Sequence, residues 1–169
     1  MQRDHFTPPP PGGSSPCLTS RRKLGVVSTV SQILQNKGNK VFQIEATATV
    51  FEAIKAMVDA NVGAILVTQD GRINGIMTER DYLRRVTLEG RTDKEARVEE
   101  IMSSPLIYVT PDSSIEECMA LMTERRIRHL PVVEGDDVVG LVSIGDLVKF
   151  QTKEQSFRIQ YLTEYITGR

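Results

Sequence analysis

Tryptophan is absent from this chain of 169 residues, and aromatic residues make up only 5% of it. Its two cysteines are too few for a zinc cluster and disfavour a secreted disulfide scaffold. No apolar run approaches the roughly 20 residues that cross a bilayer. The net charge of −1 gives no overall attraction for nucleic acid. We therefore expect no metal centre, no membrane partner and no nucleic-acid partner.

Motifs of common enzyme classes are missing as well. The chain has no Gly-x-Ser-x-Gly elbow, no His-Glu-x-x-His and no Gly-x-x-x-x-Gly-Lys loop. Because His5 lies in a proline-rich leader, His129 is the one histidine that the folded part offers as a base. Cys118 falls on an apolar helical face, where a buried and reduced thiol is predicted. We predict that the protein is not an enzyme and has no catalytic residues.

The chain begins with a leader of unusual composition, residues 1–28. Its segment TPPPPGGSSP (7–16) cannot bury enough apolar surface to fold, so we predict that the leader is disordered. Residues 1–40 contain six basic residues and one acidic residue, whereas residues 41–169 contain 15 and 21. A basic, acid-poor leader is typical of organelle transit segments, and an ordinary disordered tail explains it equally well.

The rest of the chain is an internal duplication. A shift of 65 residues aligns apolar, glycine and acidic positions of two copies. The aligned pairs include Val50 with Ile115, Met57 with Met122, Val67 with Val132, Gly75 with Gly140 and Asp81 with Asp146. Two copies, rather than many, predict a pseudo-symmetric pair of domains at 29–90 and 91–150, followed by a helix at 151–169.

Each copy has the same predicted order of elements, β-α-β-β-α, after a short leading helix at 30–34 or 98–102. The first strand is VFQI or LIYV, and the helix after it carries an apolar stripe. In copy one the stripe is Val50, Ile54, Met57 and Val58. Two buried strands follow, joined by a turn at Asp70-Gly71 or Gly135-Asp136. The closing helix has its own stripe, predicted to pack on the body or on a second subunit: Phe157, Tyr161, Leu162, Tyr165 and Ile166.

One motif occurs in both copies where the last strand meets the last helix, as GIMTERD (75–81) and GLVSIGD (140–146). Its Thr/Ser-x-x-Asp spacing is that of a capping box, in which the hydroxyl and the acid satisfy backbone N–H groups at a helix start. Ligand binding is the alternative. The glycine lets a ligand approach the backbone closely, a helix N-terminus favours phosphate, and a carboxylate can accept from both hydroxyls of a ribose.

The duplicated β-α-β-β-α order, the two motifs and the segment RIRHLPVV (126–133) resemble the CBS domain family, and the pair resembles its tandem form, the Bateman module. The resemblance implies an α+β fold in which two copies pack with pseudo-twofold symmetry and leave two clefts for adenosine-containing ligands. It implies that Asp81 and Asp146 hold ribose hydroxyls, with Thr78 and Ser143 near ribose or phosphate. Three apolar residues would flank adenine: Ile76, Ile127 and Leu141.

The two copies differ where the phosphate of such a ligand would lie. The differing pairs are Arg80 against Gly145, Arg128 against Gly63, and His129 against Ala64. Together with Asp81, the three basic side chains predict one strongly phosphate-binding cleft. The Asp146 cleft, which would face Gly63 and Ala64, is predicted to bind phosphate weakly. A partly buried, hydrogen-bonded His129 without a ligand is the alternative, and we predict that Arg84 and Arg85 lie on a solvated helix face.

The resemblance also implies a ligand and partners. AMP is the candidate ligand, with ADP, ATP, S-adenosylmethionine and NADH as alternatives, and no cofactor is obligatory. Stand-alone CBS pairs of plants are associated with organellar thioredoxin. A regulated partner such as thioredoxin, a homodimer and a mitochondrial location are therefore implied, with plastid or cytoplasm as alternatives. A purely structural interaction module that binds no nucleotide is the remaining interpretation.

Overall fold

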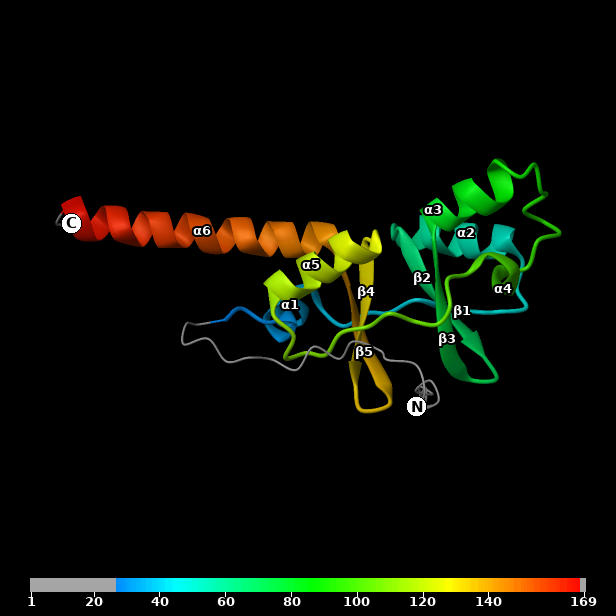
Figure 1. Cartoon of the computed structure of the whole chain (residues 1–169), viewed down its shortest axis with the longest axis horizontal. Coiled ribbons are helices and arrows are strands. Elements are labelled where there is room, and N and C mark those ends of the chain that lie inside the picture. The colour runs from blue at the N-terminus through cyan, green and yellow to red at the C-terminus, as the bar shows by residue number, and fades with distance from the viewer. Residues whose placement is uncertain (1–26, 168–169) are drawn as a thin grey trace.

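The computed structural model describes residues 27–167, in which two repeats of mixed helix and strand lie side by side and one long helix projects from the second (Figure 1). The predictions for residues 1–26, including most of the leader with His5 and Cys17, lie outside the described residues. The elements in chain order are α1 (Val30–Lys37), β1 (Gln43–Glu45), α2 (Val50–Ala60), β2 (Ala64–Gln69), β3 (Arg72–Thr78), α3 (Glu79–Tyr82), the π-helix η1 (Leu83–Thr87), α4 (Val98–Ile101), α5 (Ile115–Arg125), β4 (His129–Glu134), β5 (Asp137–Ser143) and α6 (Ile144–Thr167).

The 65-residue shift is preserved in the strand pairing. β2 pairs antiparallel with β3, and β4 pairs antiparallel with β5, in the same register and with a bulge at the same place. Both hairpins turn where the sequence predicts. Asp70 and Gly71 have φ of 52° and 75°, and Gly135 has φ of 64°. These are the left-handed conformations that two-residue hairpin loops require.

The first strand differs between the repeats. β1 pairs in parallel with β2 over three residues, whereas the predicted strand LIYV of the second repeat forms a single parallel bridge, from Val109 to Val132. That segment lies between Pro105 and Pro111, which lack the N–H that a ladder needs and restrict the residue before them. The sheet of the second repeat therefore has two strands rather than the predicted three.

The two long helices inside the repeats, α2 and α5, each begin at a capping box. Their capping boxes are Thr49 with Glu52 and Ser114 with Glu117. On α2, Val50 and Met57 are buried as predicted. Val58 is 72% exposed, which corrects its predicted place in the stripe. It lies about 80° round the helix from Val50 and so falls beyond the edge of the buried face.

The leading helices are exchanged between the repeats. α1 belongs to the first copy in sequence, yet Ile33 and Leu34 are buried in a core with α5, β4, β5 and α6. α4 belongs to the second copy, yet Val98 and Ile101 are buried in the core of α2, β2 and β3. Four backbone hydrogen bonds fix the exchange: Val30 N–H to Ser113 O (3.0 Å), Ile115 N–H to Ser28 O (3.1 Å), Val50 N–H to Ala96 O (2.9 Å) and Val98 N–H to Ala48 O (3.0 Å).

The glycine at the head of each motif is explained by this exchange. A β-carbon on Gly75 would lie 2.9 Å from both the Sδ of Met102 and the carbonyl oxygen of Ser103, just after α4. A β-carbon on Gly140 would lie 2.7 Å from a methyl group of Leu34, on α1. The prediction that these glycines make room for a ligand is therefore corrected, since each makes room for the leading segment of the other copy.

α6 runs from the second motif into the closing helix without a break. Its first turns pack on the second repeat, and Ser28 Oγ donates to Glu154 Oε1 at 2.5 Å. Its last turns project away from both repeats (Figure 1). Four of the five predicted stripe residues, Phe157, Tyr161, Tyr165 and Ile166, are 61–82% exposed, so they do not pack on the body. The other alternative, packing on a second subunit, stays a prediction. The side chain of Leu162 lies outside those described. No helix within residues 27–167 has the length and apolar character to span a membrane.

Candidate functional site

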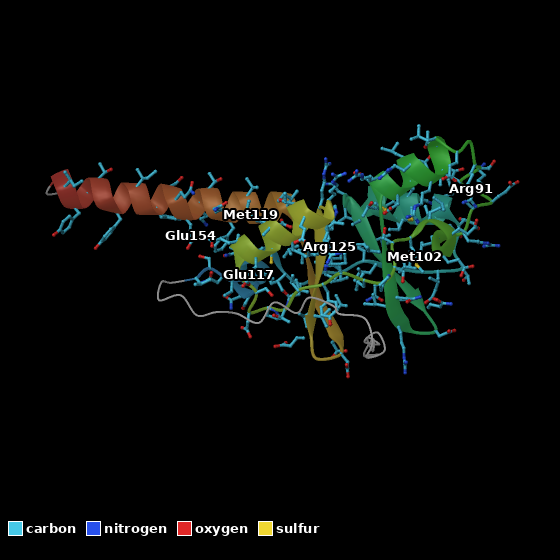
Figure 2. All side chains as sticks on the ribbon, viewed as in Figure 1. Arg91, Met102, Glu117, Met119, Arg125 and Glu154 are labelled. Carbon is cyan, nitrogen blue, oxygen red and sulfur yellow. The ribbon has the colours of Figure 1, made fainter. Side chains whose placement is uncertain are left out.

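A cavity of about 780 Å³ lies at the junction of the two repeats. β3, α3 and η1 form one wall, and the end of α5 with the start of β4 forms the other. In Figure 2 this end of α5, marked by Arg125, faces the first repeat. Seven of the ten residues singled out in the sequence line the cavity: Ile76, Thr78, Arg80, Asp81, Ile127, Arg128 and His129. The other three, Leu141, Ser143 and Asp146, do not line it.

The first motif has capping geometry at the edge of this cavity. Asp81 Oδ2 accepts from the hydroxyl of Thr78 at 2.6 Å and from its N–H at 2.9 Å. Asp81 N–H donates back to Thr78 Oγ1 at 3.3 Å. The other carboxylate oxygen, Oδ1, has only the hydroxyl of Ser103 at 3.3 Å. One oxygen is therefore committed to the helix start, and the second is weakly held beside the cavity.

The helix that this motif opens is short. α3 has four residues and continues as the five-residue π-helix η1. A single α-turn has only a small aligned dipole, so this helix start attracts phosphate less than the sequence predicts. Attraction for an anion at this site must therefore come from side chains.

The two repeats are linked across the cavity by an arginine. Arg80 Nη1 donates to the backbone carbonyl of Arg126 at 3.0 Å. Arg85 Nη1 donates to the carbonyl oxygens of Ile101 and Met102, each at 3.1 Å. Both guanidinium groups are thus held in place by backbone oxygens that do not neutralise them.

His129 is half-buried and lies between several charges. Burial lowers its pKa, and the positive charges of Lys37 and Arg128 lower it further, whereas Asp146 and Glu79 act in the opposite direction. The net lowering favours a neutral imidazole near pH 7. A β-carbon on Gly63 would lie 3.5 Å from the ring, so Gly63 belongs to this cavity. Gly63 was predicted to line a separate cleft with Asp146, but Asp146 does not line the cavity that contains Gly63.

The second motif has the same cap and a different neighbour. Asp146 Oδ2 accepts from the hydroxyl of Ser143 at 2.7 Å and from its N–H at 2.9 Å. Lys37, in the last turn of α1, places its Nζ 2.5 Å from the same oxygen and 3.2 Å from the carbonyl oxygen of Leu141. Burial acts to raise the pKa of Asp146, but the hydrogen bonds from Lys37 and Ser143 outweigh it, so the pKa lies below its ordinary value.

Sequence reasoning missed most of the charge around the cavity. Arg84 and Arg85, predicted to lie on a solvated face, line it, and so do Arg125 and Arg126, which were not singled out. The signal was present in the run RRIR (125–128), whose counterpart in the first copy is ANVG. The end of α5 differs from the end of α2 by three arginines, at positions where the other repeat has none.

The described residues show neither a metal site nor a reactive thiol. Within 27–167, no group of three or more His, Cys, Asp and Glu side chains is placed to hold a metal ion. Cys118 is fully buried, as predicted. Burial, with a contribution from Glu117, raises the pKa of its thiol to about 12, which keeps it protonated and inert.

Comparison with known proteins agrees with the duplicated architecture. The sequence profile of the family described as "CBS domain" matches this chain twice, at residues 30–87 and 98–153. The chain belongs to the CBS domain family. The two matches show a tandem pair with short mixed sheets, as the sequence predicts. Proteins of this family are regulatory modules.

Two relatives of this CBS pair show how far the likeness extends. The mitochondrial CBS domain-containing protein CBSX3 of Arabidopsis thaliana is 39% identical over 83% of this chain and 73% of its own. A Burkholderia ambifaria protein with CBS domains is 49% identical and has a TM-score of 0.74, over 76% of this chain and 96% of its own. Pairs of this kind thus occur in plants and bacteria.

A more distant structure holds ligands. The CBS domain pair of protein MJ0100, solved with 5′-methylthioadenosine and S-adenosyl-L-methionine, has a TM-score of 0.66 over 76% of this chain and 98% of its own. It is 22% identical, so the likeness shows a shared fold.

Proposed function

We propose that this CBS pair is a non-catalytic regulatory module that binds one adenosine nucleotide in the cavity between its repeats. The observation that carries the proposal is the convergence of seven residues, selected from sequence, on one cavity built by both copies. The adenosine compounds bound by the CBS pair of MJ0100 support the ligand class.

Each part of a nucleotide has a complementary group here. The weakly held Oδ1 of Asp81 accepts from ribose hydroxyls, as acidic residues do in other nucleotide sites. Ile76 and Ile127 provide apolar surface for adenine. Arg128 and Arg80 provide charge for the phosphate, with Thr78 near the ribose.

The second motif, in this proposal, binds nucleotide weakly or not at all. Its carboxylate already has a cation, since Lys37 lies 2.5 Å from Asp146. A ribose would have to displace this ion pair before it could reach the carboxylate.

The location of the cavity between the two repeats provides a way for the ligand to regulate a partner protein. Because its walls belong to different repeats, a ligand that binds both of them favours one relative arrangement, and a partner that prefers that arrangement binds more tightly. We propose that the regulated partner is a thioredoxin and that the module forms a homodimer. We also propose a mitochondrial location, which is supported by the likeness of this chain to a mitochondrial protein of Arabidopsis. The exposed aromatic face of α6 is available for the second copy.

A thermal-shift panel of AMP, ADP, ATP, S-adenosylmethionine and NADH tests the proposal. A ligand at a hundredfold excess over its Kd should stabilise the fold by about 2.7 kcal/mol. Absence of a shift with all five would favour the alternative, an interaction module without nucleotide.

A further inference from the structure

We propose that the cavity binds its phosphate-bearing ligand together with one proton, which His129 takes up, so that the affinity for the ligand rises as the pH falls below neutrality. This linkage rests on the proposed function for the identity of the ligand. It gives the module a second input, because binding then depends on the concentration of protons as well as on that of the nucleotide.

The imidazole of His129 faces the cavity without a hydrogen-bond partner from the protein. His129 is the first residue of β4 and lines the cavity. Within residues 27–167, its ring makes no hydrogen bond, although every side-chain nitrogen or oxygen that is fully buried there has a partner. The ring nitrogens therefore reach solvent at the wall of the cavity. A ligand bound in the cavity can make a hydrogen bond with them.

The first repeat shows that the strand itself does not need a histidine at this position. Ala64 begins β2 as His129 begins β4, and each pairs with the hydroxyl residue of the motif that follows, Thr78 or Ser143. Ala64 is buried and occupies its position without a polar side chain. The imidazole is thus additional to what the pairing of the strands requires, which indicates a functional reason for it.

The groups around His129 keep its ring neutral until an anion binds. Burial and the charge of Lys37 on α1 lower its pKa, Asp146 on α6 and Glu79 on α3 raise it, and the adjacent Arg128 lowers it further, so that the net direction is down. A phosphate group in the cavity adds a negative charge of about two, which favours the protonated ring. The proton comes from solvent, and the imidazolium donates a hydrogen bond to a phosphate oxygen. Because the bound form holds this proton more tightly than the free form, binding strengthens as the pH falls between the two pKa values.

The first test follows the imidazole of the full chain by NMR while the pH is varied. The chain has two histidines, so the variant His5→Gln assigns the signal of His129. We expect saturating AMP to move the titration midpoint of His129 upward by at least about one pH unit. Sulfate, a dianion that does not titrate in this range, should move the midpoint in the same direction. Adenosine, which carries no charge, should leave it in place.

The second test measures the linkage by calorimetry. Between about pH 7.5 and pH 6.5, the affinity of the wild type for AMP should rise about twofold to fivefold, and a comparison of two buffers with different enthalpies of ionisation should show proton uptake on binding. His129→Gln keeps a polar side chain but cannot titrate, so both the rise and the uptake should be lost. His5→Gln, the same change at the other histidine, is the control and should retain both.

The outcomes separate this linkage from the proposed function. An unchanged midpoint of His129 with saturating AMP, or the same rise in affinity in His129→Gln, would overturn the linkage and leave the proposed function in place. If AMP fails to bind while sulfate still moves the midpoint, the proposed function is overturned and the linkage of an anion to a proton is supported. If AMP fails to bind and sulfate leaves the midpoint in place, both are overturned.

Discussion

The two motifs of this chain are built alike and have different neighbours. In both, the aspartate accepts from the hydroxyl three residues earlier and from its N–H, with the same geometry. The difference comes from the exchanged leading helices. α4 ends early, and Ser103 then pairs with Ile76 and places only a hydroxyl near Asp81. α1 runs one turn longer and brings the ammonium of Lys37 onto Asp146. A duplicated motif has thus diverged through the segment packed against it.

The largest expected effect is the difference in nucleotide affinity between variants of the two aspartates. Asp81→Ala removes an acceptor for two ribose hydroxyls, and hydrogen bonds to charged groups contribute about 1.5–3 kcal/mol each. We expect nucleotide affinity in calorimetry to fall at least about a hundredfold. Asp146→Ala should change it less than about threefold, because Asp146 does not line the cavity. Asp81→Asn, which retains an acceptor for the cap, controls for unfolding. Equal losses at the two aspartates would contradict the asymmetry.

Substitution of the two motif glycines should also affect the two copies unequally, with the greater loss of stability in the first copy. A β-carbon on Gly75 meets the backbone oxygen of Ser103, which is fixed by reciprocal hydrogen bonds with Ile76. The atoms nearest to a β-carbon on Gly140 belong to the side chain of Leu34, which can rotate. Overpacking costs about 1–3 kcal/mol, so we expect Gly75→Ala near the upper end and Gly140→Ala near the lower end. Urea unfolding measures both, and the reverse order would show that the α1 contact is the more rigid.

Lys37 should control access to the second motif. Lys37→Ala leaves Asp146 without its cation, so a second, weaker nucleotide-binding event should appear in calorimetry at high ligand concentration. Lys40→Ala, a change of the same charge at an exposed position, is the control and should leave a single event. A single event in both variants would show that something other than Lys37 closes this motif.

The smallest expected effect is on acid stability. The pKa of Asp146 in the folded state lies below its ordinary value of 3.8, so the folded state binds this proton less tightly than the unfolded chain does. Its contribution to stability is therefore present above pH 3.8 and is lost as the pH falls through the lower folded pKa. Asp146→Asn should lose less stability than the wild type between about pH 6 and pH 3 in urea unfolding. Parallel losses would contradict the role of the ion pair.

Features that depend on local sequence were predictable. The duplication, the capping boxes at Thr49 and Ser114 and the hairpin turns at Gly71 and Gly135 follow from short-range patterns, and the structure has all of them. The exposed Val58 and the missing strand LIYV are failures at the edges of such patterns, where a helix face ends or prolines interrupt pairing.

Features that depend on the packing of one copy's leading helix into the core of the other copy were not predictable. α1 and α4 have similar apolar patterns, so either could fill either core, and only the structure shows that they are exchanged. The place of Gly63 beside His129 and the ion pair of Lys37 with Asp146, 109 residues apart, follow from that exchange. The sequence shows Arg125 and Arg126 as part of a basic run. Their place in the lining of the cavity depends on where α5 ends, which the sequence does not fix.

The exchanged helices also determine what counts as a folding unit. A fragment that ends at residue 90 would keep α1 but lose the core that buries Ile33 and Leu34, and it would lack Val98 and Ile101 from its own interior. The complementary fragment would have the opposite defect. Each half is completed only by a segment of the other, so the two copies gain their cores together. The pair should therefore unfold in one cooperative transition, as a single structural domain encoded by two repeats.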